Sequence, residues 1–66
     1  MTNTIENMFS RMGAVSSIVL PSMVTATWKN ESDARHCAKV LRGIQLKPEV
    51  FADPTGNGNW IVTAGL

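Results

Sequence analysis

Apolar residues near the start of the chain recur with the spacing of one face of an α-helix. They stand at positions i, i+3, i+4 and i+7: Ile5, Met8, Phe9 and Met12. Asn3 and Glu6 have the spacing of a capping box, and Gly13 can end a helix in the left-handed conformation. The pattern predicts a helix over about residues 3–12 whose apolar stripe is core. The alternative is a detachable helix that docks in a partner's groove, since Gly13 would allow it to move.

A second helical pattern covers residues 30–43, NESDARHCAKVLRG. Its small apolar residues repeat with the same spacing: Ala34, Cys37, Ala38 and Leu41. Asn30 is a good N-cap, and Asp33 stands three residues later, where its carboxylate can reach back. Gly43 is expected to end the helix, with Ile44 making the hydrophobic contact that often follows a terminating glycine. The pattern predicts a helix over residues 31–43 that can approach a sheet closely.

The remaining segments read as strands. Residues 14–29 are rich in Val, Ile, Thr and Trp, and Pro21-Ser22 divides them into two strands joined by a tight turn. In the second of these strands, Val24, Ala26 and Trp28 alternate with Met23 and two threonines, which marks the threonine side as the wetter face. Segments 50–52 and 60–64 read as a hairpin around the loop DPTGNGN, residues 53–59. Pro48 confines the start of the third strand to a sheet edge or a strand end.

The predicted order α-β-β-α-β-β favours one small two-layer α+β domain over residues 1–66. We expect an antiparallel sheet of three or four strands with helix packed on one face. The alternative is a winged helix-turn-helix in which residues 31–43 are the recognition helix and residues 52–60 are the wing. That fold needs another helix within residues 14–29, where β-branched residues and Pro21 stand.

Composition adds limits to this picture. The 66 residues are 44% hydrophobic and 17% charged, as in a globular domain. A hydrophobic core of this size seldom gives a free energy of unfolding above about 3–5 kcal/mol without a disulfide, a metal or a partner subunit. One cysteine excludes an intramolecular disulfide, and one Cys with one His is half of a zinc site. Oligomerisation or docking onto a partner is therefore the remaining source of additional stability.

Charge and hydropathy exclude several classes of function. The net charge of +1 argues against a nucleic-acid mimic and gives little support to a general polyanion binder. No run of about 18 apolar residues exists, so no membrane span is expected. The segment MTNTIENMFS lacks the basic and apolar regions of a signal peptide. Together with the lone cysteine, this favours a cytoplasmic protein.

His36-Cys37 is the one candidate in the sequence for a thiolate with a neighbouring base. Neighbouring residues on a helix point about 100° apart, so the pair does not face one substrate. Cys37 falls on the apolar stripe, where a free cysteine behaves as a small hydrophobe. The sequence also lacks paired carboxylates, a nucleophile with its base and a cofactor fingerprint. We therefore expect a protein that is not an enzyme and that uses no cofactor and no metal.

Two surfaces are candidates for binding a partner. Arg35, Lys39 and Arg42 follow i, i+4, i+7 and form one stripe on the outer side of the second helix, although Glu31 can share Arg35. The loop at residues 53–59 is glycine-rich but lacks the Lys-Ser/Thr ending of a phosphate loop, and its single carboxylate does not make a calcium site. We interpret the loop as a hairpin turn whose exposed Asn57 and Asn59 are candidate contacts.

Two wider similarities concern family and type of protein. The run ATWKNESDARHCAKVLRG followed by NWIVTAG resembles half of a SPOR peptidoglycan-binding repeat, in which a strand, an Ala/Leu helix and a returning strand follow one another. The resemblance covers half a unit and no export signal accompanies it, so the family's function is not carried over. In size the chain is similar to the small accessory proteins with which bacteriophages bind and inhibit host machinery.

These observations lead to one main functional hypothesis and two others. The main one is a protein-interaction module, an inhibitor or adaptor of a larger cellular or host protein, of the type that phages encode. It would use the outer face of the second helix or the 53–59 loop. The alternative is a small nucleic-acid-binding protein of winged-helix type. The third is self-association through an edge strand or the methionine-rich helix.

Overall fold

The computed structural model describes the backbone of residues 2–66 and the side chains from Ile5 onward. In chain order the elements are α1 (Thr2–Arg11), β1 (Ser16–Val19), β2 (Met23–Trp28), α2 (Glu31–Gly43), β3 (Pro48–Ala52) and β4 (Trp60–Gly65). The predicted order of elements is therefore confirmed. The clearest difference in length is in β3, which begins at Pro48, two residues before the predicted start.

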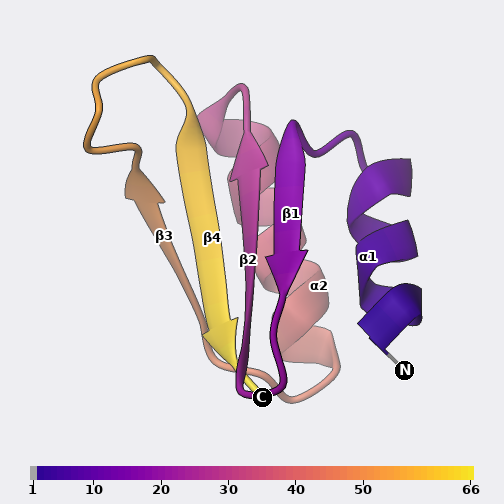
Figure 1. Cartoon of the computed structure of the whole chain (residues 1–66). Helices are drawn as coiled ribbons and strands as arrows, with labels where there is room; N and C mark the ends of the chain where they lie inside the picture. The colour runs from indigo at the N-terminus through magenta and orange to yellow at the C-terminus, as the bar shows by residue number, and fades with distance from the viewer. Residues whose placement is uncertain (1) are drawn as a thin grey trace.

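The four strands form one antiparallel sheet in the order β1-β2-β4-β3, as Figure 1 shows. Pro21-Ser22 makes a tight turn between β1 and β2, where the Leu20 N–H donates to the Met23 carbonyl at 2.8 Å. β4 returns between β2 and β3, so that Val62 lies opposite Ala26 on one side and Val50 on the other. The predicted α+β class and antiparallel sheet are confirmed, with four strands.

The winged helix-turn-helix alternative is wrong. It required a helix within residues 14–29, but this segment forms β1 and the central strand β2. The β-branched residues of the segment fit a pleated sheet, and Pro21 stands in the turn, where no ladder hydrogen bond is lost.

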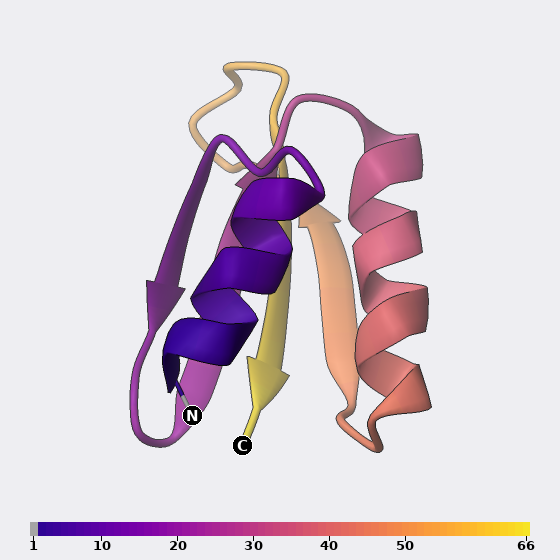
Figure 2. The same ribbon diagram turned by 90° about the vertical axis from the view of Figure 1, so that its right-hand side faces the viewer.

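Both helices cover the same face of the sheet, and in Figure 2 α1 lies in front of the strands and α2 stands beside β3. α1 contacts β1, whereas α2 contacts β2, β4 and β3. Phe9 of α1 is fully buried and meets the Trp28 ring edge-on, with 6.3 Å between the ring centroids and 89° between the planes. The interpretation of the α1 stripe as core is confirmed. Neither helix within residues 2–66 has the length and apolar character needed to cross a bilayer.

The inner face of the sheet and the facing stripe of α2 supply the rest of the core. Small side chains dominate where α2 meets the sheet, which allows the close approach expected from the sequence. The core cluster consists of ten buried residues, Phe9, Val24, Ala26, Trp28, Ala34, Cys37, Ala38, Leu41, Val62 and Ala64, and Pro48 of β3 is also buried. On β2 the threonines are only half-buried, so the threonine side is the wetter face, as predicted.

Each of the four helix ends can be compared with its predicted cap. Gly13 has a φ of +92° after α1, as expected. Asn30 caps α2, because its Oδ1 accepts from the Asp33 N–H at 2.9 Å. The Asp33 carboxylate reaches back to the Asn30 side-chain amide, at 3.1 Å, and not to its backbone N–H. α1 begins at Thr2, so Asn3 lies inside its first turn.

The end of α2 differs from the prediction. The left-handed residue is Gln45, with a φ of +69°, and not Gly43. The Leu46 N–H donates to the Leu41 carbonyl at 3.1 Å and the Gln45 N–H donates to the Arg42 carbonyl at 3.0 Å, which is a Schellman motif. Leu46 makes the accompanying hydrophobic contact, whereas Ile44 is 52% exposed. The prediction placed the motif two residues too early because it assumed a glycine at the left-handed position.

Candidate functional site

β3 is an edge strand with part of its main chain unpaired. The Asp53 N–H donates to the Asn59 carbonyl at 2.9 Å, which places these two residues at a hydrogen-bonding position of the ladder. In an antiparallel ladder such pairs alternate, so the next ones are Phe51 with Ile61 and Glu49 with Thr63. The residues between them turn their main chain away from β4: Pro48, Val50 and Ala52.

The outward main chain of β3 offers five hydrogen-bonding groups. Val50 and Ala52 each present one N–H and one C=O, and Pro48 presents a C=O. A proline at an outward position leaves the ladder to β4 intact, because its missing N–H would have pointed to solvent. The sequence argument from Pro48 to an edge position is therefore confirmed.

The basic stripe of α2 lies on the side of the helix that faces away from α1. Residues are spaced about 100° apart around a helix, which places Arg35, Lys39 and Arg42 on one flank of the buried stripe and Val40 on the other. Val40 is half-buried, whereas all three cations are exposed. Because the core includes Phe9 of α1, the half-buried flank is the one toward α1. The cations therefore border the β3 side, and we call Arg35, Lys39 and Arg42 the basic flank.

The basic flank runs along the length of β3. Seven residues of helix separate Arg35 from Arg42, which is about 10 Å at 1.5 Å per residue. Five strand residues, Pro48–Ala52, extend over a similar length, about 13 Å. The short connection after α2 brings the Arg42 end of the helix to the Pro48 end of the strand, and Figure 2 shows α2 and β3 running in opposite directions. We call the outward main chain of β3 together with the basic flank the β3 edge.

One of the three cations is neutralised within the helix. Arg35 donates from Nε and Nη2 to Oε2 of Glu31, at 2.8 and 2.6 Å, so the predicted pairing is confirmed. In the part of the chain that the structure describes, Lys39 and Arg42 take part in no ion pair. Lys47, just before β3, is also exposed. The β3 edge thus carries uncompensated positive charge.

The loop at residues 53–59 is organised by its own side chains. Oδ1 of Asp53 accepts from the Thr55 N–H at 2.9 Å and from the Thr55 hydroxyl at 2.8 Å, and these bonds lower the pKa of Asp53. Oδ1 of Asn57 accepts from the Asn59 N–H at 3.0 Å. Gly56 and Gly58 both have positive φ values, which suits glycine. The amide oxygen of Asn57 is therefore used in shaping the turn, although its side chain is exposed.

The structure brings three of the five predicted contact residues together. Arg35, Lys39 and Arg42 share the basic flank, whereas Asn57 and Asn59 lie in the loop that follows β3. In Figure 2 this loop and the first turn of α2 lie at the same end of the sheet, and the last turn of α2 lies at the other end. The loop therefore adjoins the Arg35 end of the β3 edge.

The side chains of Cys37 and His36 leave α2 in different directions, one toward the core and one toward solvent. Cys37 is fully buried, and burial raises the pKa of its thiol to about 11, so the thiol stays protonated at neutral pH. His36 is exposed on the outer side of α2. The interpretation of Cys37 as a packing residue is confirmed. Over residues 2–66, no three His, Cys, Asp or Glu side chains come together in a group that could hold a metal ion.

No segment within residues 2–66 covers the sheet face opposite the helices, and this face is almost uncharged. Two cross-strand rows run over it, Ile18-Thr25-Thr63-Glu49 and Ser16-Thr27-Ile61-Phe51. Glu49 is the one ionisable residue in these rows, and Ile18 and Phe51 are 59% and 41% exposed. We call this surface the open face. The alternation of threonine with buried residues along β2 was the sequence signal for it.

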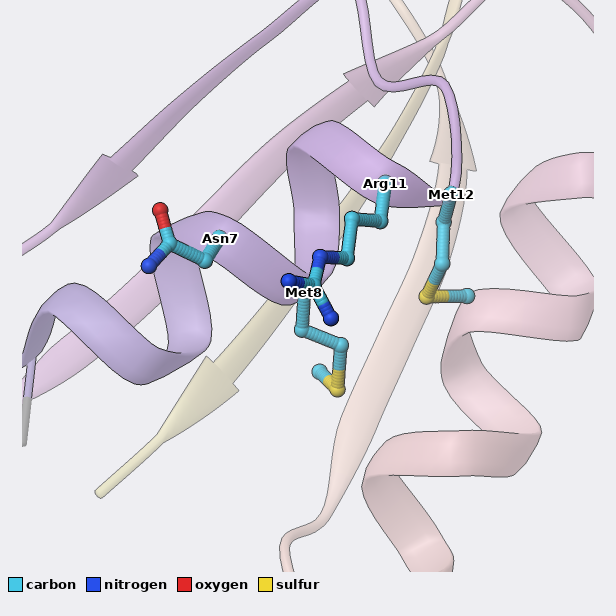
Figure 3. Close-up of a pocket in the computed structure, with 4 residues that line it drawn as sticks. All are labelled: Asn7, Met8, Arg11 and Met12. Carbon is cyan, nitrogen blue, oxygen red and sulfur yellow. The ribbon is translucent and has the colours of Figure 1, made fainter.

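A hollow of about 510 Å³ lies against the flank of α1. Its lining residues are Asn7, Met8, Arg11 and Met12. Figure 3 shows the two methionine side chains extending from α1 to the same side of the helix. Three of these residues belong to α1 and Met12 directly follows it, and their groups include neither a nucleophile nor a base. The hollow therefore offers adaptable apolar surface and not a reactive site.

The position of the β3 edge could not be found from the sequence. The basic stripe was visible at its i, i+4, i+7 spacing, but its neighbour depends on the strand order β1-β2-β4-β3. Comparison of the chain with known protein families, with curated proteins and with solved structures finds no match.

Proposed function

We propose that this chain is a small non-enzymatic protein-interaction module, an inhibitor or adaptor of a larger protein, and that the β3 edge is its contact surface. The observation that carries the proposal is the juxtaposition of an unpaired edge strand with uncompensated cations. Val50 and Ala52 turn their main chain outward beside a helix flank on which Lys39 and Arg42 lack an acidic partner. Main-chain groups and charge on one surface are what an extended polypeptide partner requires.

A protein partner suits the β3 edge better than a nucleic acid does. The flank holds three cations, one of which is shared with Glu31, so few phosphates could be neutralised there. The nucleic-acid alternative also depended on a winged helix, and the segment needed for it forms β1 and β2. The outward N–H and C=O groups of β3, by contrast, match another polypeptide main chain.

The chemistry of the described side chains supports binding and not catalysis. The thiol of Cys37 lies in the core with its pKa raised to about 11, so it packs and does not attack. The carboxylate of Glu31 is engaged with Arg35, and that of Asp53 is engaged with Thr55. The cytoplasmic setting and the phage origin stay predictions from the sequence.

The proposal can be tested by partner capture with two matched charge reversals. The tagged wild-type chain is used for pull-down from its native cell or host, with and without nuclease, beside Lys39→Glu/Arg42→Glu. The control is Arg11→Glu/Lys29→Glu, which makes the same change in net charge at exposed positions that are not part of the β3 edge, one on α1 and one between β2 and α2. We expect a stoichiometric protein that survives nuclease, is lost with the first variant and is kept with the control.

Two outcomes would contradict the proposal. Loss of all captured material on nuclease treatment would indicate a nucleic-acid binder. Retention of the partner by Lys39→Glu/Arg42→Glu, with loss in Ile18→Asn, would move the contact surface to the open face. Ile18 is 59% exposed, so this substitution leaves the core unchanged and tests the surface alone.

A further inference from the structure

The two edges of the sheet differ in their protection and in their charge. At β1, the Leu20–Met23 hydrogen bond fixes the alternation, so Ser17 and Val19 are the residues that turn outward. Neither is charged, and α1 packs against this strand. At β3, the outward main chain lies beside the basic flank. The edges are therefore chemically distinct although both are unpaired.

We propose that the β3 edge binds an extended acidic segment of a partner protein as a fifth, antiparallel strand of the sheet. The inference rests on the proposed function and adds to it the binding mode and the chemistry of the partner. The incoming strand would lie about 4.8 Å beyond β3, the usual spacing of neighbouring strands. It would bond to both groups of Val50, both groups of Ala52 and the carbonyl of Pro48.

The alternation of side chains determines where the acidic residues must stand. In an antiparallel pair, residues directly opposite each other point to the same face. Val50 lies opposite the buried Val62. The β3 residues whose main chain turns outward therefore have their side chains on the face that carries the helices. Partner residues opposite Val50 and Ala52 would therefore point toward α2 as well. The residue opposite Pro48 belongs to the same alternate set, and successive members are about 7 Å apart. Acidic residues in this set would meet Arg42 at the Pro48 end of β3 and Lys39 near Val50.

The same charges argue against a second copy of this chain as the occupant. Pairing β3 with β3 of another copy about a twofold axis would bring the two basic flanks together. Lys39 and Arg42 of one copy would then lie near Lys39 and Arg42 of the other. Among the described residues the only ion pair joins Glu31 to Arg35, so no carboxylate of the helix offsets this repulsion. Like charges at such a contact oppose association. An acidic strand is the complementary partner.

The test is an NMR titration of the ¹⁵N-labelled full chain with end-capped ten-residue peptides. The probe alternates Glu and Val, and its first control alternates Lys and Val. Two further controls carry N-methyl groups, on every Glu in one peptide and on every Val in the other. We expect the probe to shift the Val50 and Ala52 amide signals and slow their hydrogen exchange, and to leave Ser17 and Val19 unchanged.

The two N-methylated peptides test which partner residues lie opposite Val50 and Ala52. In the proposed register the Glu residues lie opposite Val50 and Ala52 and make the interchain hydrogen bonds, so N-methyl-Glu abolishes binding and N-methyl-Val does not. Ala52→Pro should have the same effect as N-methyl-Glu, because it removes an outward N–H and no ladder bond. The peptide controls need no change in the protein, so they hold even if this variant fails to fold.

The charge dependence is measured with the variants already described. Lys39→Glu/Arg42→Glu should raise the Kd of the Glu-Val peptide about tenfold or more, since two attractions become repulsions. Arg11→Glu/Lys29→Glu should change it by less than about twofold.

Three results would overturn the inference. They are absence of binding by the Glu-Val peptide, equal binding by its N-methyl-Glu form, and shifts centred on β1 or on the open face. Each would leave the proposed function standing if partner capture still depended on Lys39 and Arg42. Loss of that dependence would overturn both.

Discussion

At the scale of single residues, Gln45 carries the least favourable backbone conformation described. Its φ of +69° is the one positive value at a non-glycine position among residues 2–66. A side chain in the left-handed region costs roughly 1 kcal/mol, and only glycine avoids most of that cost. The Schellman hydrogen bonds of Leu46 and Gln45 hold the residue there.

Replacing Gln45 with glycine should therefore stabilise the protein. We expect Gln45→Gly to raise the free energy of unfolding by about 0.5–1 kcal/mol, measured by urea denaturation. Gly43→Ala is the matched comparison, because Gly43 is helical and a Cβ there would contact nothing within 4 Å. It should stabilise by about 0.5–1 kcal/mol through helix propensity. A loss of stability in Gln45→Gly would contradict the assignment of the cap.

At the scale of elements, local signals in the sequence were enough to predict most boundaries. Asn30 and the apolar spacing after it predicted the limits of α2 as found. The left-handed residue after α2 was misplaced because the terminating glycine rule pointed to Gly43, whereas the packing of Leu46 against the core places the left-handed turn at Gln45. Local rules show that a helix ends in this region, but tertiary contacts determine which residue adopts the left-handed conformation.

α1 is fastened to the sheet mainly by one side chain. Phe9 is the one fully buried residue of α1 among the side chains described, and it meets Trp28 edge-on. Ile5, Met8 and Met12 pack around it and are only partly buried. Removing Phe9 should therefore release α1 and expose the inner face of β1 and β2.

We expect Phe9→Ala to cost about 3–5 kcal/mol, comparable to the whole stability of a domain of this size. The variant should show no cooperative thermal transition by circular dichroism. Phe9→Leu should keep a transition, with a cost of about 1–2 kcal/mol. Met12→Ala is the control, because Met12 borders the hollow on α1 and should cost less than Phe9→Leu. A cooperative transition near that of wild type in Phe9→Ala would show that α1 contributes little to the core.

At the scale of the whole molecule, the sequence could not determine which surfaces come together. Pairing of β2 with β4 joins residues far apart in the chain, and the alternating pattern of each strand is compatible with several orders. The grouping of Arg35, Lys39 and Arg42 was a local feature and was predicted. Their position beside an unpaired strand followed from β4 lying inside the sheet, so the β3 edge required the structure.

The basic flank should also keep copies of the chain apart at the β3 edge. We expect Lys39→Ala/Arg42→Ala to increase self-association at high protein concentration and low salt, measured by sedimentation velocity. Added salt should have the same effect on wild type, since the screening length falls to about 8 Å at 0.15 M. Arg11→Ala/Lys29→Ala is the control of equal charge. Identical sedimentation of the two double variants would contradict this role, and the self-association hypothesis would then rest on other surfaces.

The place of β4 in the sheet also has a consequence for biosynthesis. β4 is the last of the four strands to be translated, yet β2 and β3 both pair with it. Until residues 60–65 have emerged from the ribosome, the nascent chain can form α1, the β1–β2 hairpin and α2, but β2 and β3 have no central partner. Folding must therefore follow translation of β4, and during that interval the apolar inner face of β2 is available to chaperones and proteases.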